Sequence, residues 1–138
     1  MSRVTRRGFV ALLGTATLCW AVPAFAGSYL DRAALMLQQA ATDADFLRAR
    51  LSDKELARVV HKMASARVDA ASHMIVPKEV TQAHPHLLLV LENYERAAEF
   101  AKDGRAEKFL IYQQRAQEEE RILKGVLKQL GWSLPPVR

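Results

Sequence analysis

Helical periodicity is the feature of this sequence that most restricts its fold. Through most of the chain, apolar residues recur every three or four positions, the spacing that gathers them on one side of an α-helix. Beyond the N-terminal segment the only glycines are Gly104, Gly125 and Gly131, and no run alternates between apolar and polar residues as a half-buried strand does. The chain is therefore expected to be all-helical.

Helix-capping and helix-breaking residues divide the periodic region into four helices. Ser52 and Glu55 have capping-box spacing, Pro77 stops a helix, Pro85 suits a first turn and Gly131 a C-cap. The predicted helices cover residues 29–50, 54–76, 84–102 and 105–130, with a short helical turn over 78–83. Short links between amphipathic helices favour an up-down-up-down four-helix bundle in one domain, residues 27–138. The tail that contains Pro135 is expected to fold back over one end of the bundle.

Each helix has a predicted core-facing stripe. In the second helix the stripe comprises Leu56, Val59, Val60, Met63, Ala66, Ala70 and Met74. The other three helices present stripes centred on Leu37, Leu91 and Leu123. Together they predict a core of leucine and alanine.

Two charged residues interrupt these stripes. Arg67 falls within the second stripe, and Glu119 lies at the seam of the fourth helix, with Glu120 beside it. Each is about fourteen residues into its helix, so both stand at the same height in an up-down bundle. The interpretation is a half-buried Arg67–Glu119 pair that fixes helix register. The alternatives are a carboxylate lining a small-ligand pocket, and side chains that both extend outward.

Histidine and methionine residues gather at one predicted end of the bundle. His73 and Met74 close the second helix, and His84 and His86 open the third. Imidazole with thioether suits copper, and imidazole alone suits zinc or nickel, so these residues are a candidate metal site. The simpler interpretation is two solvent-facing histidines, one capping histidine and a core methionine. His61 projects to the solvent side of the predicted stripe and is left out of the cluster.

Motifs for most enzyme classes are absent from the sequence. No Glu-x-x-His occurs, which argues against a di-iron bundle, and no P-loop, Rossmann or G-x-S-x-G pattern is present. Catalysis is therefore not expected.

The N-terminus resembles the twin-arginine family of bacterial signal peptides. The residues from Thr5 to Val10 match its [ST]-R-R-x-F-[LV] pattern, with Arg6, Arg7 and Phe9 at the recognition positions. This resemblance implies that the chain engages the twin-arginine (Tat) translocase and works in the periplasm or outside the cell.

An apolar run follows the arginines and ends in Ala24-Phe25-Ala26, a small-x-small triplet that leader peptidase accepts. The prediction is that residues 1–26 are removed, that Gly27 begins the mature protein and that no stable membrane anchor remains. Three arginines leave with the leader, which lowers the formal net charge from +5 to +2 and weakens a nucleic-acid interpretation. Cys19 also leaves, so the mature chain has no cysteine for disulfides, iron–sulfur clusters or nucleophilic catalysis.

These observations favour a non-catalytic accessory module that binds a protein partner and holds no cofactor. Ile111 and Ile122 project roughly opposite the fourth stripe and are the predicted docking face, either for that partner or for self-association. The first alternative is a periplasmic protein that handles a copper, zinc or nickel ion. The second is a bundle that binds a small ligand in a polar pocket at mid-core.

Overall fold

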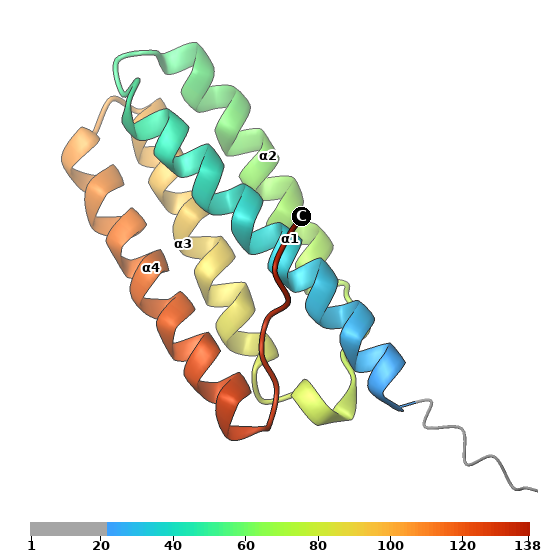
Figure 1. Ribbon diagram of the computed structural model, residues 1–138. Coiled ribbons are helices and arrows are strands. Elements are labelled where there is room, and N and C mark those ends of the chain that lie inside the picture. Colours follow the sequence, from blue (N-terminus) through green and yellow to red (C-terminus); the bar gives the residue numbers. More distant parts are fainter. Residues whose placement is uncertain (1–21) are drawn as a thin grey trace, which may run out of the picture.

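The computed structural model describes residues 22–138, which form four helices in the predicted up-down-up-down bundle (Figure 1). The elements are α1 (Val22–Arg48), α2 (Lys54–Ser72), the 3₁₀ helix η1 (Lys78–Val80), α3 (His84–Lys102) and α4 (Ala106–Gln129). No strand occurs in this part of the chain, so the all-helical prediction is confirmed. The leader positions Arg6, Arg7 and Phe9 lie outside the described residues.

Helix α1 begins at Val22 rather than at the predicted residue 29. Pro23 stands in its first turn, where the missing amide hydrogen breaks no helical hydrogen bond. Ala26 is fully buried on the side that packs against the bundle, and this burial favours the earlier start. The predicted cleavage point, which follows Ala24 and Ala26, therefore lies within a helical segment, and cleavage itself stays a prediction.

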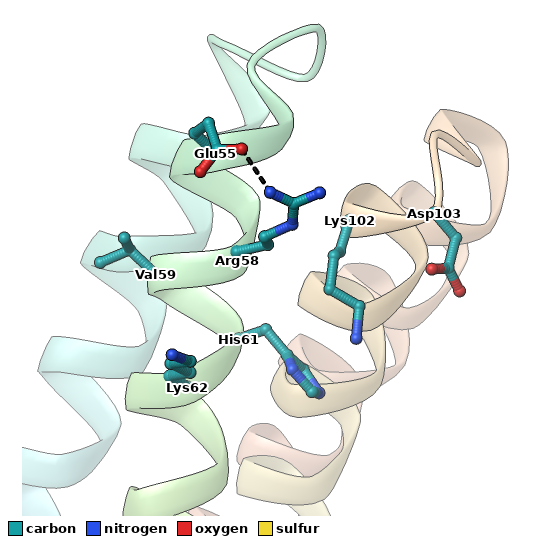
Figure 2. Close-up of a pocket in the computed structure, with 7 residues that line it drawn as sticks. All are labelled: Glu55, Arg58, Val59, His61, Lys62, Lys102 and Asp103. Carbon is teal, nitrogen blue, oxygen red and sulfur yellow. Dashed lines mark hydrogen bonds and ion pairs between the residues drawn. The ribbon is translucent and has the colours of Figure 1, made fainter.

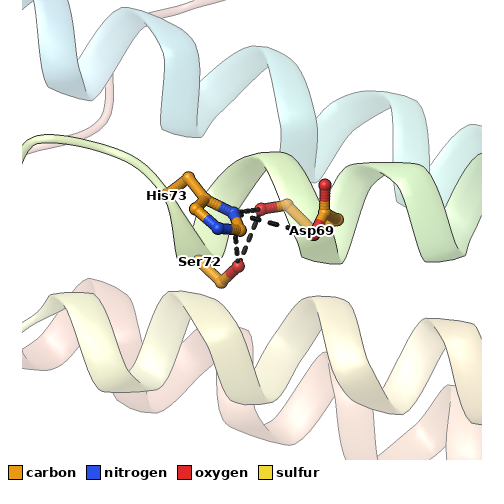
Figure 3. Close-up of polar contacts among 3 residues, drawn as sticks. All are labelled: Asp69, Ser72 and His73. Carbon is orange, nitrogen blue, oxygen red and sulfur yellow. Dashed lines mark hydrogen bonds and ion pairs between the residues drawn. The ribbon is translucent and has the colours of Figure 1, made fainter.

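Helix α2 ends at Ser72, earlier than Pro77 alone would require. The Ser72 hydroxyl donates to the Asp69 carbonyl at 2.7 Å, and Nδ1 of His73 lies 2.8 Å from the same oxygen (Figure 3). The His73 amide bonds to the Ala70 carbonyl three residues back, which tightens the last turn. The side chains of Ser72 and His73 therefore satisfy a carbonyl of the last turn where α2 ends, before the chain reaches the proline.

The core formed by α1, α3 and α4 follows the predicted stripes. Helix α3 packs against all three other helices, and its Leu91 is 1% exposed. Leu37 of α1 and Leu123 of α4 are buried against it, together with Phe109, which is fully buried. Glycine at positive φ ends α4 at Gly131, as expected of a C-cap.

The predicted core face of α2 is wrong by one residue. The buried residues of this helix are Ala57, Val60, Ala64 and Ala71. One residue of rotation is roughly 100°, so much of the predicted stripe turns toward solvent. Val59 is 55% exposed and Met63 is 46% exposed. The small alanines of the buried face allow α2 to pack closely against α3.

The C-terminal tail also takes a course that differs from the prediction. Figure 1 shows it turning back after α4 and running beside α1, instead of covering the end of the bundle. Leu134 and Trp132 pack against the core on the way.

Candidate functional site

The outer side of α2 carries a continuous row of exposed apolar residues, here named the α2 stripe. Its members follow at spacings of four, three and four and so share one helix face: Val59, Met63, Ala66 and Ala70. All four are exposed, while three alanines of the same helix are buried. An exposed row of this kind is typical of a surface that contacts another molecule.

A cavity of about 560 Å³ adjoins the stripe at Val59. Its lining comes from α2 and from the end of α3: Glu55, Arg58, Val59, His61, Lys62, Lys102 and Asp103. Figure 2 shows Arg58, His61 and Lys102 extending into the space between the two helices. His61 is half-buried here. The prediction that His61 faces solvent is wrong because it rests on a core face of α2 that is displaced by one residue.

The cavity has an excess of positive charge. The Arg58 guanidinium forms an ion pair with Glu55 three residues earlier, which neutralises both groups (Figure 2). Of the remaining lining charges, Lys62 and Lys102 are positive and Asp103 is negative. An acidic group of a bound molecule would therefore be attracted to this end of the α2 stripe.

The histidines of the candidate metal site have separate partners. His84 Nδ1 lies 2.8 Å from the Tyr29 hydroxyl, and His86 Nδ1 lies 2.8 Å from Glu119 Oε1. His73 bonds to the backbone at the end of α2. Among residues 22–138, no three His, Cys, Asp or Glu side chains form a group suited to a metal ion. Met74 packs against the core as expected. A copper, zinc or nickel site on these residues remains a prediction.

The Tyr29–His84 contact joins the N-terminal half of α1 to the start of α3. Tyr29 is 1% exposed, and burial raises the pKa of its hydroxyl to about 12, so it stays protonated. Burial lowers the pKa of the His84 imidazole below its ordinary 6.5, and a hydrogen bond to the Ala71 backbone opposes this shift. A neutral imidazole that donates to the Ala71 carbonyl can accept the Tyr29 hydrogen through Nδ1. This arrangement favours a structural role for His84.

The expected ion pair between Arg67 and Glu119 does not form. Arg67 instead binds Asp43 of α1 at 2.8 Å, with its side chain 9% exposed. Glu119 pairs with His86 of α3. Equal height along the bundle did not place the two charges on facing sides, because Arg67 points toward α1. Glu120 lies 4.0 Å from Lys124 on its own helix.

The polar layer at this level leaves little free space. The cavity beside Arg67 and Tyr94 has a volume of about 10 Å³, room for one water molecule. Burial, with the nearby carboxylates of Glu120 and Asp45, raises the pKa of Tyr94 to about 12. Gln113 is 2% exposed and donates to Asp45 Oδ1 at 3.0 Å. The layer ties helices together and gives no support to a ligand pocket at mid-core.

The docking face predicted on α4 is exposed, but polar residues interrupt it. Ile111 and Ile122 are 36% and 48% exposed, respectively. Polar side chains, among them Arg115 and Glu118, occupy the helix surface between them. The α2 stripe is the more continuous apolar face. Hydrophobic periodicity alone did not indicate this surface, because it predicts that Val59, Met63, Ala66 and Ala70 face the core.

Comparison with protein-family models, with curated proteins and with solved structures finds no match to this chain. The helices of residues 22–138 include none that is long and apolar enough to span a membrane.

Proposed function

We propose that this chain is an exported, non-catalytic accessory module that binds an amphipathic helix of a protein partner along the α2 stripe. The observation that carries the proposal is the row of four exposed apolar residues from Val59 to Ala70, with bulky members at one end. Apolar residues at this spacing of three and four form the contact face when one helix packs against another. Exposed apolar surface of this length is stabilised when a second apolar face covers it.

Charge at one end of the stripe indicates what kind of helix fits. Lys62 and Lys102 leave the cavity beside Val59 with an excess of positive charge. A partner helix with an acidic residue one turn beyond its apolar face would place that residue near this positively charged end of the stripe. This charge complementarity would fix the orientation of the partner and speed the encounter.

The proposed export is based on the resemblance of the N-terminal residues to twin-arginine signal peptides. The pathway that this leader resembles carries folded proteins. An antiparallel bundle has mostly local contacts and is expected to fold within microseconds to milliseconds. Changing Arg6 and Arg7 to lysine should retain the full-length chain in the cytoplasm, as measured by cell fractionation. Unchanged export of this variant would contradict the proposed route.

Photo-crosslinking tests the docking surface. A photoreactive amino acid is placed at Met63 of the full chain, in the cells that produce the protein. Ile122 serves as the matched control, since it has a similar exposed fraction on another helix. We expect one heterologous protein to be cross-linked from Met63 and not from Ile122, and it is identified by mass spectrometry.

Binding measured with the purified proteins then decides whether the cross-link reports the proposed contact. Changing Val59 and Met63 to glutamate should weaken binding at least tenfold, because two acidic groups replace the apolar contact. The same change at Ile111 and Ile122 is the control and should have little effect. Equal weakening by both variants, or cross-links only between two copies of this chain, would refute the proposal.

A further inference from the structure

The C-terminal strap, residues 132–138, lies over the groove between α1 and α4 (Figure 1). Gly131, with φ of 84°, turns the chain back, and the Trp132 amide bonds to the Leu127 carbonyl at 2.8 Å. Beyond that bond, no hydrogen bond joins the strap to the helices of the described region. Apolar contacts, including those of Leu134, therefore hold it in place.

Two cavities flank the strap. The first, of about 420 Å³, is lined by Lys124, Lys128, Trp132, Ser133 and Leu134. The second, of about 320 Å³, lies between α1, α4 and the strap. Its lining shares Lys124 and Leu134 with the first cavity and also includes the polar side chains of Gln38 and Glu120. Their shared lining shows that the two cavities are neighbours. Both are open to solvent, and their volumes fall in the range of about 300–1,000 Å³ that is typical of small-molecule sites.

The charged and apolar parts of this region are adjacent. Lys124 and Lys128 are four residues apart and so lie on one face of α4. The Lys124 ammonium is 4.0 Å from the Glu120 carboxylate, beyond hydrogen-bond distance, and its side chain is 59% exposed. The indole of Trp132 and the side chain of Leu134 supply apolar surface next to the two ammonium groups.

We propose that this region binds a single-chain alkyl carboxylate, that is, a free fatty acid. Lys124 and Lys128 hold the carboxylate, and the alkyl chain lies under the strap beside Trp132 and Leu134. The strap can move to admit the chain because only apolar contacts secure it beyond Trp132. The site uses no residue of the α2 stripe and is independent of the protein-docking proposal.

Fluorescence titration tests this site in the full chain. Changing Trp20 to phenylalanine leaves Trp132 as the only tryptophan, so its emission reports the site directly. We expect saturable binding of decanoate below its micelle concentration. Binding should be roughly tenfold tighter for decanoate than for octanoate, because two further methylene groups are buried. Decyltrimethylammonium, with the same chain and a positive head, should bind at least tenfold more weakly than decanoate.

Charge reversal separates the proposed site from general adsorption to apolar surface. Changing Lys124 and Lys128 to glutamate should weaken decanoate binding at least tenfold. Changing Lys78 and Lys108 to glutamate is the matched control, since both are exposed and the net charge changes equally. Circular dichroism checks that both variants are folded. Equal binding by both variants, equal binding of the cationic amphiphile, or an unchanged Trp132 emission would overturn the proposal.

Discussion

Replacing Val59 and Val60 one at a time by alanine tests which side of α2 faces the core. The two changes remove the same two carbon atoms at neighbouring positions, so differences in helix propensity cancel. Val60 is 7% exposed and Val59 is 55% exposed. At about 0.8 kcal/mol per buried carbon, transfer alone makes the Val60 change about 0.8 kcal/mol more costly, and the enclosed void adds to this. The expected difference is about 1–2 kcal/mol.

Urea unfolding of the full chain, followed by far-ultraviolet circular dichroism, measures this difference. The two variants should share one denaturant slope and differ in midpoint, with the Val60→Ala variant the less stable. In thermal unfolding, about 1 kcal/mol corresponds to a Tm shift of roughly 4 °C for a domain of this size. Equal losses, or a larger loss for Val59→Ala, would place Val59 in the core and remove the α2 stripe as a docking surface.

The neighbouring pair Met63 and Ala64 gives a reciprocal check of the same rotation. Ala64 is 3% exposed, so leucine at this position overpacks the α2–α3 contact and should cost about 1–3 kcal/mol. Met63 is 46% exposed, and alanine there should cost about 1 kcal/mol or less, because no enclosed cavity results. If Met63 faced the core, its truncation would instead cost about 2–5 kcal/mol, and leucine at Ala64 would be nearly neutral.

Three further changes probe the interior. Because burial lowers the pKa of His84, its imidazole binds a proton more readily in the unfolded chain than in the folded one below pH 6.5. The free energy of unfolding should therefore fall as pH drops from 6.5 through the folded-state pKa, and His84→Asn should flatten this part of a urea-unfolding pH profile. Arg67→Ala leaves Asp43 unpaired and should cost about 1–3 kcal/mol in urea unfolding, less when Asp43→Asn is added. Phe109→Ala, at a fully buried site, should lower the free energy of unfolding by about 3–5 kcal/mol in the same assay.

The bundle itself could be predicted from the sequence because its helices have clear local signals. Pro85 and the Asp103-Gly104 turn mark α3 at both ends, and Gly104 takes the positive φ that such a turn requires. The start of α1 was harder to predict, because Ala26 and Tyr29 are buried by contacts that only the assembled bundle provides. Periodicity predicts the presence of a helix more reliably than it predicts the residue at which the helix begins.

The face of α2 could not be settled from the sequence alone, because two neighbouring faces are apolar. One face carries Val59 and Met63, and the other carries Ala57, Ala64 and Ala71. Hydrophobicity favours burying the bulkier face, whereas close contact with α3 favours the alanines. The choice depends on the surface of the neighbouring helix, which no pattern within α2 encodes.

The polar contacts could not be predicted either, because they too depend on how each helix is rotated about its axis. Height along the bundle follows from counting residues, but the direction of each side chain depends on how its helix is rotated. Arg67 was placed at the correct level, yet its partner is Asp43 on α1. The His86–Glu119 pair was also missed, because each residue had been assigned to a different hypothetical site.

The rotation of α2 links the packing of the fold to its proposed function. Turning the bulkier face inward would bury more of Val59 and Met63, but it would move Ser65 away from Glu95 of α3, to which it donates at 2.9 Å. It would also widen the α2–α3 contact by replacing Ala64 with larger side chains. The observed packing keeps the close contact and leaves bulky apolar surface in solvent. A partner helix that covers this surface recovers the missing apolar burial without disturbing the core, and this is the physical reason to look for a partner along α2.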